Sequence, residues 1–132
     1  MSVDWDDSLT TGIERIDAEH RVLLRLIQEL EQADNEGGER ARMQGILREI
    51  YAYAVFHFVR EENLMAASGY PARDRHRGEH QGLLAQYAAI LHEYREGRVL
   101  VQHIVELVHG WFAEHAAGAD QRLADYLRRD AS

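Results

Sequence analysis

The sequence predicts an all-α protein: an up-down-up-down antiparallel four-helix bundle with an N-terminal arm. The chain of 132 residues contains a single proline, Pro71, and its glycines gather at a few points, which is typical of long helices joined by short turns. Between these points, apolar residues recur at alternating spacings of three and four, as on a helix face that packs against a bundle core. A chain of this length forms one domain with its own core.

The breaks divide the chain into an arm, four long helices and a short helical extension. Glycine suits the end of a helix and proline the first turn of the next, so residues 69–71 should end one helix and start another. Asp17 is placed to cap the first helix. Within a single domain over 1–132, we therefore expect an arm and five helical segments: arm 1–16, helices at approximately 17–35, 39–68, 72–96 and 98–117, and an extension to about 129.

Composition excludes several classes of partner and site. The chain has 23 Asp and Glu against 15 Lys and Arg, and this acidity disfavours nucleic acids and anionic membrane surfaces as partners. It has no cysteine, which excludes disulfides, thiolate metal ligands and thiol nucleophiles. The acidic start carries no secretion signal and no apolar run is long enough to span a bilayer, so we expect a cytoplasmic protein.

Five of the eight histidines, and one glutamate, occupy core-facing positions of the four helices. Each buried imidazole without a partner would cost about 1 to 3 kcal/mol, and an unpaired carboxylate more. In an up-down-up-down bundle, the starts of the first and third helices lie at the same end as the finishes of the second and fourth. The six residues therefore meet at one end of the bundle: His20, His57, Glu61, His76, His80 and His115.

Imidazole nitrogens and carboxylate oxygens in one small volume are the ligands of a metal site. A second metal would need a further acid, and Asp120 is the candidate. Its spacing of five residues from His115 corresponds to about 140° on a regular helix, so an undistorted helix would not aim both side chains at one site. Gly118 lies between them, and we predict a distortion there.

Residues 76–80, HRGEH, also fit the signature of a zinc protease. That chemistry needs Glu79 as general base, a third ligand and a substrate cleft. A bundle offers no evident cleft, and Glu79 lies off the core-facing seam, so we expect it to be a solvated or edge residue. Glu62 adjoins Glu61 but lies off the face of His57, and we expect it to be solvated as well.

Taken together, these segments resemble the hemerythrin family, and its bacterial single-domain branch in particular. The resemblance covers nearly the whole chain and includes Trp5 in the arm. Its motifs are GIERIDAEH at 12–20, HFVREENLM at 57–65, GYP at 69–71, HRGEH at 76–80 and WFAEHAAGAD at 111–120.

The resemblance implies a centre of two non-haem iron ions joined by an oxo or hydroxo bridge. One iron would take three imidazoles, those of His76, His80 and His115. The other would take two, those of His20 and His57, and the carboxylates that bridge both would be Glu61 and Asp120. Counting bonds in two octahedra leaves one position open, on the iron with two imidazoles, where dioxygen would bind. Imidazole and carboxylate would also suit zinc or manganese, so the identification of iron depends on the resemblance.

The resemblance also implies an apolar oxygen pocket, for which plain core packing is the alternative interpretation. Its residues would be Leu23, Phe58, Trp111, Phe112 and Ala116. The family usually has a larger aliphatic residue at the position of Ala116, so we expect a roomier pocket and faster oxidation of the irons.

The expected function is reversible dioxygen binding for storage, delivery or sensing by a monomer, rather than enzymatic turnover. Two alternatives stay open. A similar centre could act as a redox enzyme that reduces peroxide or nitric oxide or oxidises ferrous iron. It could also belong to an interaction module whose metal centre controls partner binding.

Overall fold

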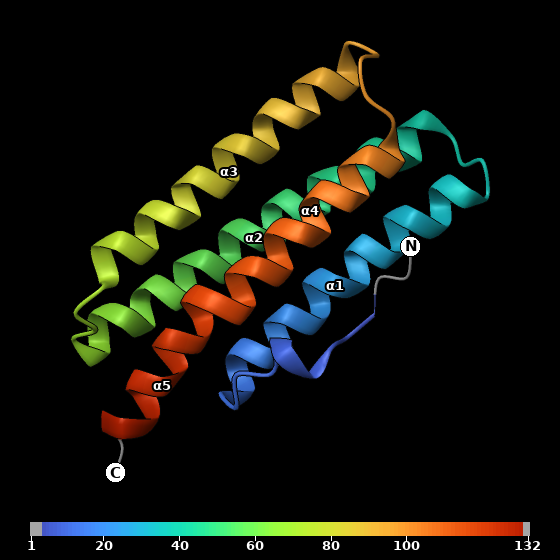
Figure 1. The fold of residues 1–132 in the computed structure, drawn as a ribbon. Helices are drawn as coiled ribbons and strands as arrows, with labels where there is room; N and C mark the ends of the chain where they lie inside the picture. The colour runs from blue at the N-terminus through green and yellow to red at the C-terminus, as the bar shows by residue number, and fades with distance from the viewer. Residues whose placement is uncertain (1–3, 131–132) are drawn as a thin grey trace.

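The computed structural model describes residues 4–130, and this part of the chain contains helices and no strand. Four long helices alternate in direction along the chain (Figure 1): α1 (Glu14–Asn35), α2 (Arg40–Ser68), α3 (Arg73–Arg95) and α4 (Val101–His115). The arm carries a short helix, η1 (Asp7–Leu9), and α4 continues through a π-helical turn, η2 (Ala116–Asp120), into α5 (Gln121–Asp130). The predicted bundle with its arm is confirmed, although residues 1–3 of the arm lie outside the described part.

The first helix begins earlier than the sequence suggested. Its first residue is Glu14 and its N-cap is Ile13, so Asp17 lies inside the first turn and the prediction that it caps the helix was wrong. Its buried carboxylate turns back to the arm instead. It accepts hydrogen bonds from the backbone N–H and the hydroxyl of Thr11, at 2.9 and 2.8 Å, and from the N–H of Gly12 at 3.1 Å. Asp17 therefore holds the arm against α1.

The turns explain the remaining boundaries. Gly69 ends α2 with φ of 68°, a left-handed conformation in which a residue with a Cβ is strained. Pro71 lies in the turn before α3, not in its first helical turn, because α3 begins at Arg73. The link after α3 is longer than expected, so α4 begins at Val101. None of the described helices is both long enough and apolar enough to cross a membrane.

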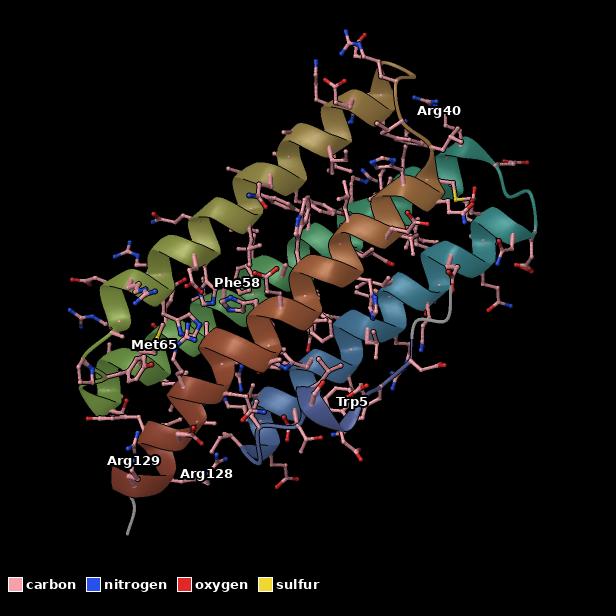
Figure 2. All side chains as sticks on the ribbon, viewed as in Figure 1. Trp5, Arg40, Phe58, Met65, Arg128 and Arg129 are labelled. Carbon is pink, nitrogen blue, oxygen red and sulfur yellow. The ribbon has the colours of Figure 1, made fainter. Side chains whose placement is uncertain are left out.

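The interior consists of two apolar clusters with polar residues between them. The larger apolar cluster fills the half of the bundle remote from the histidines, and its most buried members are Ile27, Leu30, Ala33, Leu47, Ile104 and Val105. The smaller apolar cluster closes the other end, beneath α5, and consists of Ile16, Met65 and Leu123. In Figure 2, Phe58 and Met65 lie along α2 toward the end of the bundle where α2 turns into α3. The histidines therefore lie between the larger and the smaller apolar cluster.

Candidate metal centre

Seven polar side chains converge between the two apolar clusters, and we call them the donor cluster. They come from all four long helices and from η2. Six of the side chains are 3 % exposed or less, and that of His115 is 8 % exposed. The members are His20 from α1, His57 and Glu61 from α2, His76 and His80 from α3, His115 from α4 and Asp120 from η2.

The π-helical turn η2 brings Asp120 to this cluster. A π-helix bonds residue i to residue i+5, so side chains five apart face the same side. His115 Nε2 and Asp120 Oδ1 lie 3.3 Å apart as a result. The predicted distortion is confirmed, with Gly118 at its centre. Gly118 keeps a negative φ, so the helix widens by one residue without breaking.

The donor atoms form two groups, and the atoms of each group all lie within 4.8 Å of one another. The larger group consists of Glu61, His76, His80, His115 and Asp120. The smaller group consists of His20, His57, Glu61 and Asp120. Glu61 and Asp120 belong to both groups. Each of these carboxylates is therefore placed where its two oxygens could contact two neighbouring cations.

The two acids and two of the histidines shift one another's pKa values strongly. Burial disfavours the charged form of His76, but the nearby carboxylates of Asp120 and Glu61 outweigh it and raise the pKa of His76 to about 9. In the same way, the charge of Asp120 outweighs burial and raises the pKa of His115 to about 10. Burial and the charge of Asp120 oppose ionisation of Glu61, yet hydrogen bonds from the surrounding imidazoles lower its pKa to about 2. The site therefore favours a positive charge between two carboxylates.

Hydrogen bonds among these residues do not satisfy all of their buried atoms. Across residues 4–129, the buried side-chain atoms that lack a hydrogen-bond partner all belong to the donor cluster: His20 Nδ1, His57 Nε2, Glu61 Oε2, and Asp120 Oδ1 and Oδ2. Close approaches such as 2.9 Å between His20 Nε2 and Asp120 Oδ2 do not satisfy Asp120 Oδ2, which still lacks a hydrogen-bond partner.

The nitrogens of three imidazoles also face one another. His115 Nε2 lies 3.2 Å from His76 Nε2 and 3.1 Å from His80 Nε2. Orphaned buried polar atoms cost about 1 to 3 kcal/mol each, and metal cations bound beside the two carboxylates would satisfy their orphaned oxygens and His57 Nε2. The donor set therefore fits metal ions.

Three further glutamates contact histidines of the donor cluster from behind. The contacts run from Nδ1 of each ring to a carboxylate oxygen: His57 to Glu19 at 2.6 Å, His80 to Glu62 at 2.8 Å, and His115 to Glu79 at 3.4 Å. A carboxylate only accepts hydrogen bonds, so it keeps the proton on Nδ1 and leaves the Nε2 lone pair directed at the site. Burial opposes ionisation of Glu19, but its hydrogen bonds with His57 and Arg60 outweigh burial and lower its pKa.

The sequence predicted no role for Glu19, a solvated position for Glu62, and a solvated or edge position for Glu79. That expectation was wrong for Glu62, whose side chain is only 25 % exposed and is paired with an imidazole, and incomplete for Glu79, which is 37 % exposed. A sequence pattern could have identified these three glutamates. Each glutamate directly adjoins a member of the donor cluster in sequence and contacts a histidine on the next helix, from α1 to α2, α2 to α3 and α3 to α4.

An apolar cavity of about 70 Å³ adjoins the donor cluster on the side of the larger apolar cluster. Four of the five residues expected in an oxygen pocket line it: Leu23, Phe58, Trp111 and Phe112. Two of them pack on imidazoles, with ring centroids 3.9 Å apart for Phe58 and His80 and 5.2 Å apart for Phe112 and His20. Ala116 is fully buried within η2 and does not line the cavity. That the small side chain of Ala116 makes the pocket roomier stays a prediction.

The chain is similar to known proteins in sequence and in fold. The family described as Hemerythrin HHE cation binding domain matches residues 11–127. The chain is 28% identical over 124 residues to a bacteriohemerythrin of Stenotrophomonas maltophilia, covering 94% of this chain and 80% of the relative. It is 27% identical over 128 residues to a bacteriohemerythrin of Pseudomonas aeruginosa, covering 97% and 83%. A crystal structure of a hemerythrin mutant has the same fold, with a TM-score of 0.82 at 24% identity over 94% of this chain and 95% of that one. Because the family match spans nearly the whole chain, the protein belongs to the hemerythrin family.

Proposed function

We propose that this protein binds dioxygen reversibly at a centre of two iron ions, for storage, delivery or sensing. Hemerythrins are oxygen-binding carriers rather than enzymes, which supports the proposal. The observation that carries it is the pair of donor groups that share Glu61 and Asp120, because two shared carboxylates with orphaned oxygens suit two metal ions held side by side.

The two groups suit different tasks. The larger group would hold one iron through three imidazoles, and the smaller group would hold the other through two. When bound, the iron pair would supply the two electrons that dioxygen takes up and gives back. The smaller group offers fewer donors, and both of its imidazoles, His20 and His57, border the cavity. Dioxygen would therefore approach from the cavity toward these two histidines.

Residues of the chain exclude water and proton donors from the cavity through which dioxygen would approach. An apolar cavity of this kind excludes water, which would otherwise promote loss of the bound ligand in a reduced form. Tyr87 lines the cavity, but its hydroxyl donates to the carbonyl of Leu47 at 2.7 Å, and burial raises the pKa of this hydroxyl. It therefore has no readily available proton. Glu19, Glu62 and Glu79 would orient the imidazoles that hold the irons.

Two further expectations belong to this proposal. The absence of cysteine from the sequence accords with a reducing, cytoplasmic location. All donors come from one chain, so a monomer would suffice for the site. Both stay predictions.

Reversible cycling of the visible spectrum tests the proposal. The protein is loaded with iron, reduced without oxygen, exposed to oxygen, flushed with inert gas and exposed again. We expect about two irons per chain and repeated cycling, with His103→Ala, an exposed histidine outside the donor cluster, behaving like the unmodified chain. One-way oxidation with peroxide turnover would favour the redox enzyme. Failure to bind about two irons would defeat both readings.

A further inference from the structure

Two walls of the cavity lie on either side of α3. One wall lies between α2 and α3, where Tyr51, Leu84 and Tyr87 line the cavity. The other lies between α3 and α4, where Leu83 and Trp111 line it. A ligand could reach the donor cluster through the cavity by crossing either of these walls.

The wall between α2 and α3 is tied in place. The rings of Tyr51 and Tyr87 stack with centroids 5.9 Å apart and an angle of 23° between their planes. The hydroxyl of Tyr87 is bonded to the backbone of α2 through the carbonyl of Leu47. Opening this wall would separate the stacked rings and leave a buried hydroxyl and a carbonyl without partners, which is costly.

The wall between α3 and α4 has open space on its outer side. A surface groove of about 550 Å³, which we call the outer groove, runs along α3, α4 and η2. Three residues line both the outer groove and the cavity: Leu83, Trp111 and His115. His115 is held by its contacts within the donor cluster. The partition between groove and cavity therefore consists of the partly buried side chains of Leu83 and Trp111.

Glycine keeps the outer groove clear next to this partition. Gly82 lines the groove directly before Leu83, and a Cβ built on it would meet nothing within 4 Å. A side chain at Gly82 would therefore occupy the groove without disturbing the core. Leu83 has room to swing outward into the same space.

We propose that dioxygen, and small uncharged molecules in general, enter from the outer groove by passing between Leu83 and Trp111, which act as a gate. The ligand's identity rests on the proposed function, whereas the path does not. An apolar passage admits a neutral diatomic molecule but not an ion, which would lose its hydration there. Glu79 and Glu114 line the groove and further disfavour anions, with Arg122 balancing one of these charges.

Association and dissociation rates of dioxygen test the gate, because a gate changes both rates by the same factor and leaves Kd unchanged. Leu83→Ala should raise both rates about tenfold. Leu84→Ala removes the same atoms from the next residue, which lines the cavity but not the groove, and should change the rates by less than about twofold. Gly82→Phe, which fills the groove from outside, should lower both rates even if Leu83→Ala folds poorly.

Xenon provides a readout that does not depend on oxygen chemistry, since it occupies apolar cavities. Exchange of xenon-129 between solvent and the cavity should be faster in Leu83→Ala, nearly unchanged in Leu84→Ala and slower in Gly82→Phe. If dioxygen does not bind but the xenon exchange rate changes as expected in Leu83→Ala and Gly82→Phe, the proposed function is wrong and the proposed gate is supported. If xenon exchange responds to Leu84→Ala and not to Leu83→Ala, entry lies between α2 and α3 and the gate is overturned. Rates unchanged in every variant would overturn it too.

Discussion

Deletion of Ala117 should leave the metal centre intact, although it removes a residue between two of its donors. A regular α-helix turns by about 100° per residue, so side chains five apart diverge by about 140° and side chains four apart by about 40°. His115 and Asp120 are five apart and face one another only because η2 is a π-helical turn. The deletion makes them four apart on a regular helix, where Cβ atoms lie about 5–6 Å from each other. Ala117 is exposed, so the core loses nothing.

The deleted protein should therefore bind as much iron per chain as the unmodified one, measured by elemental analysis after anaerobic loading. Regular geometry also recovers about one backbone hydrogen bond, worth about 0.5 to 1.5 kcal/mol, so the unfolding free energy should stay level or rise slightly. Deletion of Ala113 is the matched control. It removes one residue of the same type from the regular part of the same helix and turns everything beyond it by about 100°. We expect that control to lose most of its iron.

A single comparison would refute this reasoning. Asp120→Ala removes the carboxylate itself and sets the level of iron retained without it. If the protein lacking Ala117 retained no more iron than Asp120→Ala, the rotation of the helix would not be what places this carboxylate. The role assigned to η2 would then be wrong.

Three other predictions follow from the contacts around the donor cluster. Glu19→Gln keeps the size of the side chain but loses the charge behind His57, and should weaken iron binding about 10- to 100-fold in a chelator competition, with Glu29→Gln, exposed on the same helix, unchanged. The pKa values of His76 and His115 are raised from 6.5 to about 9 and 10, so their stabilisation of the metal-free fold is complete below pH 6.5 and is lost as the pH rises through 9 to 10. The urea midpoint of metal-free protein should fall over that range. Asp17→Ala should lower the unfolding free energy by about 1 to 3 kcal/mol in urea melts, because it leaves the buried donors of the arm unpaired.

Each of these has a result that contradicts it. Equal iron affinity for the Glu19 and Glu29 variants would show that the carboxylate behind His57 does not orient it. A urea midpoint that stays flat between pH 6.5 and 10 would show that the imidazoles are not protonated in the metal-free fold. A cost below about 0.5 kcal/mol for Asp17→Ala, the range of ordinary surface changes, would mean that the arm is held by other contacts.

Periodicity along single helices explains what the sequence could predict. Apolar spacing determines which face of a helix is buried, and the alternating directions then bring six of the seven donors to one end without further information. The position of Asp120 could also be predicted. On a regular α-helix, side chains five residues apart, such as those of His115 and Asp120, do not face the same side. Once Asp120 is taken as the further acid that a second metal would need, the distortion at Gly118 follows from this geometry.

Contacts across helices explain what the sequence could not predict. Glu19, Glu62 and Glu79 all lie beside the buried seam, and whether such a side chain reaches solvent or an imidazole depends on how far the neighbouring helix is rotated. Asp17 shows the same limit at the arm, since a capping residue and a residue that holds the preceding loop look alike in sequence. Ala116 was assigned to the pocket by resemblance to the family, but its side chain does not line the cavity.

The links between helices differ in their distance from the donor cluster, which lies near one end of the bundle. The link between α2 and α3 lies beside the donor cluster, whereas the links at residues 36–39 and 96–100 lie at the opposite end, behind the larger apolar cluster. Neither of these distant links contributes a donor to either group. A second domain could therefore be spliced into one of them, or the chain could be circularly permuted there, with the ligands left in place. A protein fused in this way would keep the donor cluster of the bundle unchanged.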